Sequence, residues 1–124
     1  MKKQLLLLSI AAFFVSAYAI VRIGSAQATP HTDVSYANDI RPILEGRCSN
    51  CHAGKLVSDS LNMETYEALM AGSQHGPVIV PGNASGSLLV EKLTSGQMPK
   101  RGPKLTPAQI QLIIDWINAG ALNN

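Results

Sequence analysis

Two thiols and one imidazole lie within five residues, in the stretch CSNCH that contains Cys48, Cys51 and His52. The chain of 124 residues has no other cysteine. Two thiols three positions apart can form a disulfide, act as a dithiol redox centre, contribute to a metal site or carry a covalently attached haem. The rest of the sequence has to discriminate among these four kinds of site.

Covalent haem attachment is the chemistry that uses all three residues. A thioredoxin-like redox centre requires a strand and a helix in a βαβ context, which the sequence does not indicate. A structural zinc site requires four ligands, and a disulfide leaves the imidazole without a role. In a c-type haem site, Cys48 and Cys51 form thioethers with the two vinyl groups and His52 binds the iron. The sequence therefore predicts one covalent haem c at these residues.

The second axial position of the iron has four candidates downstream. Met63 and Met70 are seven residues apart within an expected helix, a spacing that is more typical of core residues. His75 would give a bis-histidine haem if its loop folded over the ring. Met98 lies on an irregular loop beside Pro99, where a thioether is free of helical constraint, so we favour Met98 as the axial ligand. His75 and an open site remain the alternatives.

Residues 1–28 have the features of an export signal. A positive start is followed by an unbroken apolar run at residues 5–21 and by AQA at residues 26–28, which has the form of a signal-peptidase site. The apolar run is also close to the shortest segment that spans a bilayer, roughly 17 residues. We expect the chain to be exported to the periplasm, behind either a cleaved signal peptide or an uncleaved membrane anchor.

The charge balance gives no indication of nucleic-acid binding. The chain has ten Lys and Arg residues against eight Asp and Glu. Three of the ten, Lys2, Lys3 and Arg22, lie in the leader, which leaves seven against eight from Thr29 onward. A slightly negative exported part has no overall attraction for a polyanion.

After a linker at residues 29–34, residues 35–124 read as one all-α domain of three to five helices with long loops. Apolar residues at helical spacing mark a first helix, which begins near Asn38 or Asp39 and has Pro42 in its first turn. The last helix has Thr106 as its N-cap and Gly120 at its C-terminal end. Shorter helices are expected at residues 63–71 and 87–93, and residues 78–80 could be extended. Long loops in so small a domain suggest that they surround a prosthetic group.

These features together resemble the class I c-type cytochromes. In that family a C-x-x-C-H motif follows the first helix and a Met-Pro precedes the last, as do CSNCH and Met98-Pro99 here. The chain is especially similar to planctomycete-type cytochrome c domains, which share DIRPIL at residues 39–44, the VPG and SLL segments at residues 80–82 and 87–89, and the final helix with Trp116. The resemblance covers about residues 34–122 and implies a haem-binding fold.

Two functions remain open at this point. With His52 and Met98 both on the iron, the protein would be an electron carrier rather than an enzyme, and its partners would be redox proteins, including a membrane respiratory or photosynthetic complex. A haem sensor or catalytic haem with an open or displaceable axial site is the alternative, although few distal acid-base groups are available for it. Lys100, Arg101 and Lys104 follow Met98 closely, so we expect a local positive patch that steers an acidic partner.

Overall fold

The computed structural model describes residues 33–55 and 57–124, and these residues form a helical domain without β-strands. The elements in chain order are the π-helical turn η2 (Tyr36–Ile40), α2 (Arg41–Arg47), α3 (Ser49–His52), the 3₁₀ turn η3 (Ser58–Ser60), α4 (Tyr66–Ala71), α5 (Leu88–Thr94) and α6 (Pro107–Asn118). The predicted all-α class is confirmed. The leader at residues 1–28 and residues 29–32 of the linker lie outside the described residues, so the predicted domain boundaries stay predictions.

None of the helices in the described part of the chain combines the length and the apolar content needed to cross a bilayer.

The first helical segment starts at Tyr36, two to three residues earlier than the sequence indicates. Ser35 is its N-cap, since Ser35 Oγ accepts a hydrogen bond from Asn38 N at 3.2 Å. Asp39 Oδ2 accepts from Ser35 N at 2.8 Å, so Asp39 supports the cap from inside the helix. Pro42 occupies the first turn of α2, as predicted, where no helical N–H is lost. The predicted start near Asn38 or Asp39 was wrong, because Ser35, which precedes them, provides the capping acceptor.

The last helix, α6, begins and ends where the sequence predicts. Thr106 Oγ1 accepts from Gln109 N at 3.2 Å, and Gln109 Oε1 accepts from Thr106 N at 2.9 Å, which completes a capping box. Pro107 follows at the first helical position. Gly120 comes directly after the C-cap with a φ of +106°, a conformation that a residue with a Cβ rarely adopts.

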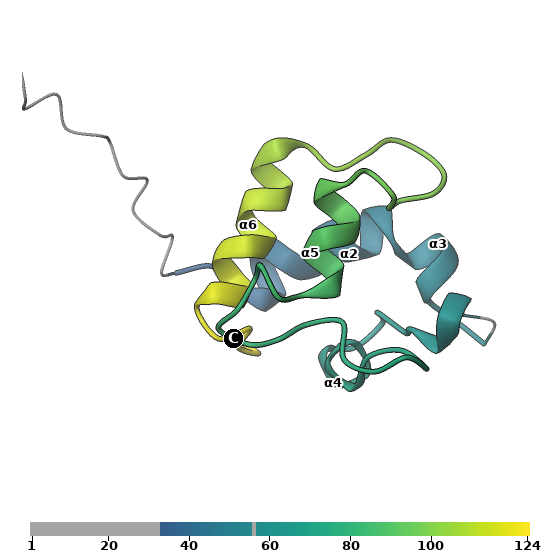
Figure 1. Cartoon of the computed structure of the whole chain (residues 1–124), viewed down its shortest axis with the longest axis horizontal. Helices are drawn as coiled ribbons and strands as arrows, with labels where there is room; N and C mark the ends of the chain where they lie inside the picture. The colour runs from purple at the N-terminus through teal and green to yellow at the C-terminus, as the bar shows by residue number, and fades with distance from the viewer. Residues whose placement is uncertain (1–32, 56) are drawn as a thin grey trace, which may run out of the picture.

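Three aromatic side chains join the two ends of the domain. The rings of Tyr36 and Tyr66 meet edge to face with their centroids 5.2 Å apart, and Tyr36 lies 5.5 Å from Trp116. Tyr66 Oη donates to the carbonyl of Ala121 at 2.7 Å. Trp116 is almost fully buried, and the elements η2 and α5 both contact α6. The two terminal segments therefore lie against each other, although they are far apart in the sequence (Figure 1).

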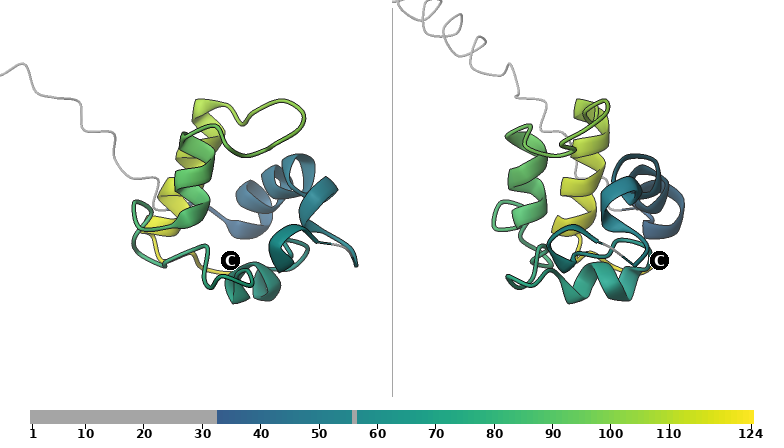
Figure 2. Two further views of the ribbon diagram at one scale, coloured as in Figure 1. Left: turned by 45° about the vertical axis from the view of Figure 1, so that its right-hand side comes forward. Right: turned by 90° about the vertical axis from the view of Figure 1, so that its right-hand side faces the viewer.

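Of the two helices between them, α5 has the predicted length and α4 is shorter than predicted. Helix α5 starts at Leu88 after its N-cap Ser87, close to the predicted start at residue 87. Helix α4 starts only at Tyr66, because Thr65 caps it and Asn62 Oδ1 already accepts from Glu64 N at 2.7 Å. Residues 78–80 do not form a strand. Figure 2 shows α5 and α6 side by side, with the α2 and α3 segment apart from them and α4 below.

The capping box makes a prediction about stability. Thr106→Ala removes the acceptor for Gln109 N and should lower the free energy of unfolding by about 1 kcal/mol, measured by denaturant titration of the haem-loaded protein. Thr106→Ser keeps the oxygen and should stay close to the parent. A Thr106→Ala variant with the parent's stability would show that the N-terminal end of α6 is held by packing alone.

Candidate functional site

A cavity of about 460 Å³ lies between the helices and is lined mainly by apolar side chains. Its apolar walls come from segments that are distant in sequence: Leu61 and Met63, Val78, and Leu88, Leu89 and Leu93 of α5. Such a volume and such walls are typical of a site for a large apolar ligand. All of the residues predicted to bind haem, Cys48, Cys51, His52 and Met98, line this one cavity.

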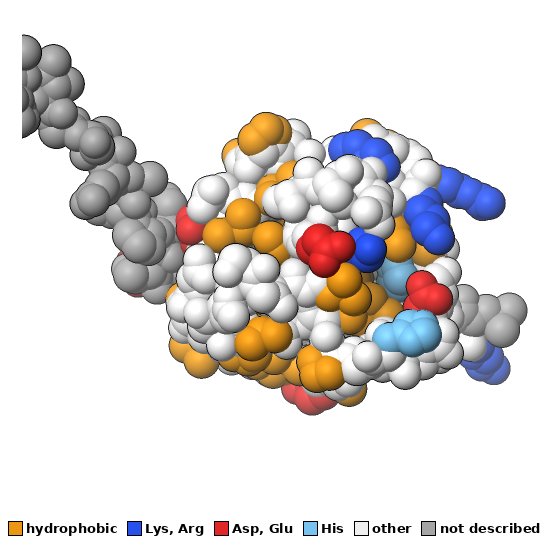
Figure 3. Space-filling model, in the orientation of Figure 1, with side chains coloured by type: hydrophobic (Ala, Val, Ile, Leu, Met, Phe, Trp, Pro, Cys, Tyr) orange, Lys and Arg blue, Asp and Glu red, His pale blue; other side chains and the backbone are white. Residues whose placement is uncertain are grey.

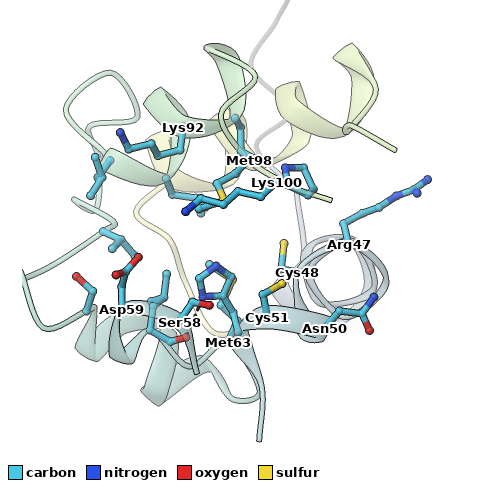
Figure 4. Close-up of a pocket in the computed structure, with 18 of the residues that line it drawn as sticks. Arg47, Cys48, Asn50, Cys51, Ser58, Asp59, Met63, Lys92, Met98 and Lys100 are labelled. Atoms are coloured by element: carbon cyan, nitrogen blue, oxygen red, sulfur yellow. Dashed lines mark hydrogen bonds between the residues drawn. The ribbon is translucent and has the colours of Figure 1, made fainter. Parts of the chain in front are cut away.

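Both thiols are free and reach the cavity from one side (Figure 4). Cys48 is the C-cap of α2, and Cys51 lies one turn later in α3, so the helical turn through CSNCH presents the two sulfurs together. Burial raises the pKa of the Cys48 thiol to about 11, and the nearby Cys51 thiol adds to that shift. Cys48 therefore keeps its hydrogen at neutral pH.

His52 ends α3 and is buried, with 7% of its surface exposed. Its Nδ1 lies 3.2 Å from the carbonyl oxygen of Leu61, which can only accept, so Nδ1 carries the hydrogen and Nε2 is the unprotonated nitrogen. Nε2 has no hydrogen-bond partner within residues 33–55 and 57–124. Within these residues, every fully buried side-chain nitrogen has a hydrogen-bond partner. Since Nε2 has none, it cannot be fully buried, and it must keep access to the cavity that His52 lines. This is the tautomer and orientation of a histidine that binds iron.

Met98 is held on the loop that follows α5. Its backbone N donates to the carbonyl of Lys92 at 3.0 Å, and the next residue, Pro99, is buried. The Lys104 ammonium donates to the carbonyl of Pro99, and this bond links two parts of the same loop. Figure 4 shows Met98 and Met63 on opposite sides of the cavity. A thioether on a fixed loop is thus presented to the cavity.

Met63 and Met70, which were expected within one helix, have different positions in the structure. Met63 lies before α4 rather than in it, and its backbone N donates to the carbonyl of His52 at 2.7 Å. Met63 is 5% exposed and lines the cavity, whereas Met70 lies in α4 and packs against the core without lining the cavity. Only the N-capping signal of Thr65 within METYEALM could have shown that the helix starts after Met63.

His75 also lines the cavity, but it is an exposed residue on a tight turn. Ser73 and Gly76 exchange two backbone hydrogen bonds around it, of 2.9 and 3.0 Å. Gly72 allows this turn, because a Cβ there would lie 2.5 Å from the carbonyl oxygen of Gly76. His75 is therefore near the site, and the choice between it and Met98 as axial ligand stays a prediction.

The residues of the cavity fit a covalently attached haem by their chemistry. Two free thiols can form the thioethers, a buried imidazole has a free Nε2, and a thioether is available on a separate loop. Apolar walls suit the macrocycle, and the cations Arg47, Lys92 and Lys100 at the cavity suit its carboxylates. Within the described residues, no three His, Cys, Asp or Glu side chains are grouped as ligands of a bare metal ion.

A helical domain with this set of residues around one cavity has the features expected of a c-type cytochrome. The comparison with protein families makes the class more specific: residues 48–102 match a family model described as Planctomycete cytochrome C. The matched residues include Cys48, Cys51, His52 and Met98, while α6 lies outside them. The resemblance to planctomycete-type cytochrome c domains is thereby confirmed, and cytochrome c domains bind haem and transfer electrons.

No curated protein and no solved structure shows significant similarity to the chain.

The two thiols make a prediction about haem retention. Changing both Cys48 and Cys51 to Ala should abolish the haem that resists acid-acetone extraction, because no thioether can then form. Mass spectrometry of the native protein gives the same information as a mass increase equal to one haem. Haem that stays bound to the double variant through extraction would refute the assignment.

Proposed function

We propose that the protein is a mono-haem c-type cytochrome that carries single electrons between redox partners outside the cytoplasmic membrane. It works as a free carrier or as a subunit of a membrane redox complex. The observation that carries the proposal is that the two thiols, the free Nε2 of His52 and the thioether of Met98 all have access to one apolar cavity. When bound, haem supplies a reversible one-electron change at its iron.

Each residue has a distinct role in this proposal. Cys48 and Cys51 attach the group covalently, so it is not lost when its charge changes. His52 binds the iron through Nε2, and its Nδ1–H bond to the Leu61 carbonyl fixes the ring and raises its basicity. Met98 would hold the iron as a second ligand, and its neutral thioether would favour the ferrous state and raise the potential. If His52 and Met98 both held the iron, no position would be left for a substrate, which favours electron transfer over catalysis.

The apolar walls contribute to the same function by excluding water. A charge change in a water-exposed site is accompanied by a large reorganisation of the solvent, whereas fixed apolar side chains reorganise little. Val78, Leu89 and Leu93 line the cavity and are at most 6% exposed. A low dielectric around the group also favours the less charged, ferrous form.

A haem sensor or catalytic haem remains the second candidate, and the position of His75 supports it. His75 lines the cavity, and its only ring hydrogen bond within the described residues is to the exposed Gln74, whose Nε2 lies 3.3 Å from His75 Nε2. If Met98 were displaced from the iron, His75 would be a base close to an open face. A high-spin spectrum in the resting protein would support an open site of this kind.

The proposed location, on the outer side of the cytoplasmic membrane, rests on the sequence of the leader. Residues 5–21 are apolar and follow two lysines, so they serve either as a removed signal or as an anchor with its lysines on the cytoplasmic side. In both cases the haem domain lies on the periplasmic side.

Replacement of Met98 tests the axial assignment. Met98→His should keep a low-spin haem and lower the potential by on the order of 100 mV, within the roughly 0.8 V range over which axial ligands act, because imidazole stabilises ferric iron better than a thioether does. The measurements are a potentiometric titration and the visible spectrum. The weak near-infrared sulfur-to-iron band of the oxidised parent should disappear.

Met63→Leu is the matched control, since Met63 lines the same cavity from the opposite side. It should keep both the near-infrared band and most of the parent's potential. If Met98→His left the potential unchanged, Met98 would not be the ligand. A spectral change in His75→Ala would then identify His75 in its place.

A further inference from the structure

The loop that joins α5 to α6 carries Met98, and its two halves are fixed to different degrees. The half before Met98 is bonded to α5. Met98 N donates to the carbonyl of Lys92 at 3.0 Å, and the Lys92 ammonium donates to Gln97 Oε1 at 2.8 Å. The chain is therefore held in place as it enters Met98.

The half after Met98 is held by much less. Pro99 and Leu105 are buried, whereas residues 100–104 between them are all exposed. Among the residues that the structure describes, a single hydrogen bond involves residues 99–105: the Lys104 ammonium donates to the carbonyl of Pro99. This bond joins the two ends of the exposed segment. Its loss would leave the segment fixed only by the two buried residues that flank it.

Lys104 differs from the two other cations of this segment. In the space-filling view, Lys and Arg side chains gather over the loop between α5 and α6 (Figure 3). Lys100 and Arg101 line the cavity, but Lys104 does not, and its ammonium is engaged within the loop. Steering of an acidic partner stays a prediction for Lys100 and Arg101. The role of Lys104 has to be sought in the loop itself.

The bond from Lys104 acts next to the predicted axial ligand, because Pro99 is joined directly to Met98. A carbonyl held by a charged donor restricts the backbone on one side of Met98. The bond from Met98 N to the Lys92 carbonyl restricts it on the other side. Met98 lines the cavity and is only partly buried, so packing contributes less to its position than it does for a core residue.

We propose that Lys104 is a positioning residue for Met98, whose thioether it keeps at the cavity by closing residues 99–104. The inference rests on the proposed axial role of Met98 and adds the residue that maintains it. A methionine thioether is a weak axial ligand, so its occupancy of the iron depends on how rarely its loop opens. An open loop would leave the second face of the iron accessible to an external ligand.

Removal of the ammonium tests the proposal. Lys104→Ala should raise the affinity of the ferric, haem-loaded protein for added imidazole about fivefold, as expected for the loss of one hydrogen bond that holds the loop closed. In this exchange an iron–sulfur bond breaks, an iron–nitrogen bond forms and the iron stays ferric. The titration is followed by the visible spectrum at about pH 8, where most imidazole is neutral and insensitive to the charge of the protein. Lys104→Arg keeps a charged donor and should bind imidazole like the parent.

Two controls separate this effect from a change in charge and from a general loss of stability. Arg101→Ala removes the same charge from the same exposed segment, but it breaks no hydrogen bond in the part of the chain that the structure describes. Tyr66→Phe removes the bond from Tyr66 Oη to the Ala121 carbonyl, at the opposite end of α6, and so lowers stability without touching the loop. Both variants should bind imidazole with the parent's affinity.

The second measurement needs no added ligand. The Met98 amide hydrogen is bonded to the Lys92 carbonyl, so its exchange with solvent reports how often the loop opens. It is followed by NMR of the reduced, haem-loaded protein. Exchange should be about fivefold faster in Lys104→Ala than in the parent and unchanged in Arg101→Ala.

The two failures can be told apart. An oxidised parent without the near-infrared sulfur-to-iron band would overturn the axial role of Met98 and this inference with it. If the parent has the band, equal imidazole affinity or equal exchange of the Met98 amide in Lys104→Ala and Arg101→Ala would overturn the role of Lys104 alone.

Discussion

The hydrogen bond between His52 Nδ1 and the carbonyl of Leu61 is the interaction on which the site depends. It sets the tautomer of a buried imidazole and so decides which nitrogen is available to iron. The return bond, from Met63 N to the carbonyl of His52, ties the same two segments together a second time. The residues after the CSNCH turn are thereby held against it, and they form the cavity wall on that side. Without this pair of bonds, neither the ring nor the wall would have a fixed place.

The opposite wall is fixed by different means. Helices α5 and α6 pack on each other, and the loop between them carries Met98. That loop is tied to α5 by the bond from Met98 N to the carbonyl of Lys92, and Lys104 links it internally by donating to the carbonyl of Pro99. Each wall is thus stabilised internally, and the cavity is what remains between them. Such a division is suited to a domain that must accommodate a large rigid group, since neither wall has to fill the centre with its own side chains.

Sequence reasoning predicted those features that are encoded locally. The N-cap at Thr106, the end of α6 at Gly120 and the C-x-x-C-H turn each depend on residues within one or two helical turns, so their spacing is sufficient to predict them. The start of α4 was placed too early, because Met63 has good helix propensity but its backbone N is engaged by His52, eleven positions earlier. The role of Lys104 was also missed, since a carbonyl five residues away competes for its ammonium. Long-range partners and backbone acceptors leave no periodic signal in a sequence.

Asn124 makes contact with the opposite end of the domain in a way that bears on the order of folding. Its side chain accepts from Tyr36 N at 2.9 Å and its carbonyl accepts from Ala37 N at 3.0 Å, so residues nearly ninety positions apart are joined. Closing a loop of that length has an entropic cost, and the contacts that it forms stabilise the domain only when both ends are already ordered. The junction of η2 with the segment after α6 is therefore a late event, which follows formation of the local helical turns. Until then the two walls are free to separate, so the CSNCH turn is more accessible to a large rigid group than it is in the folded domain.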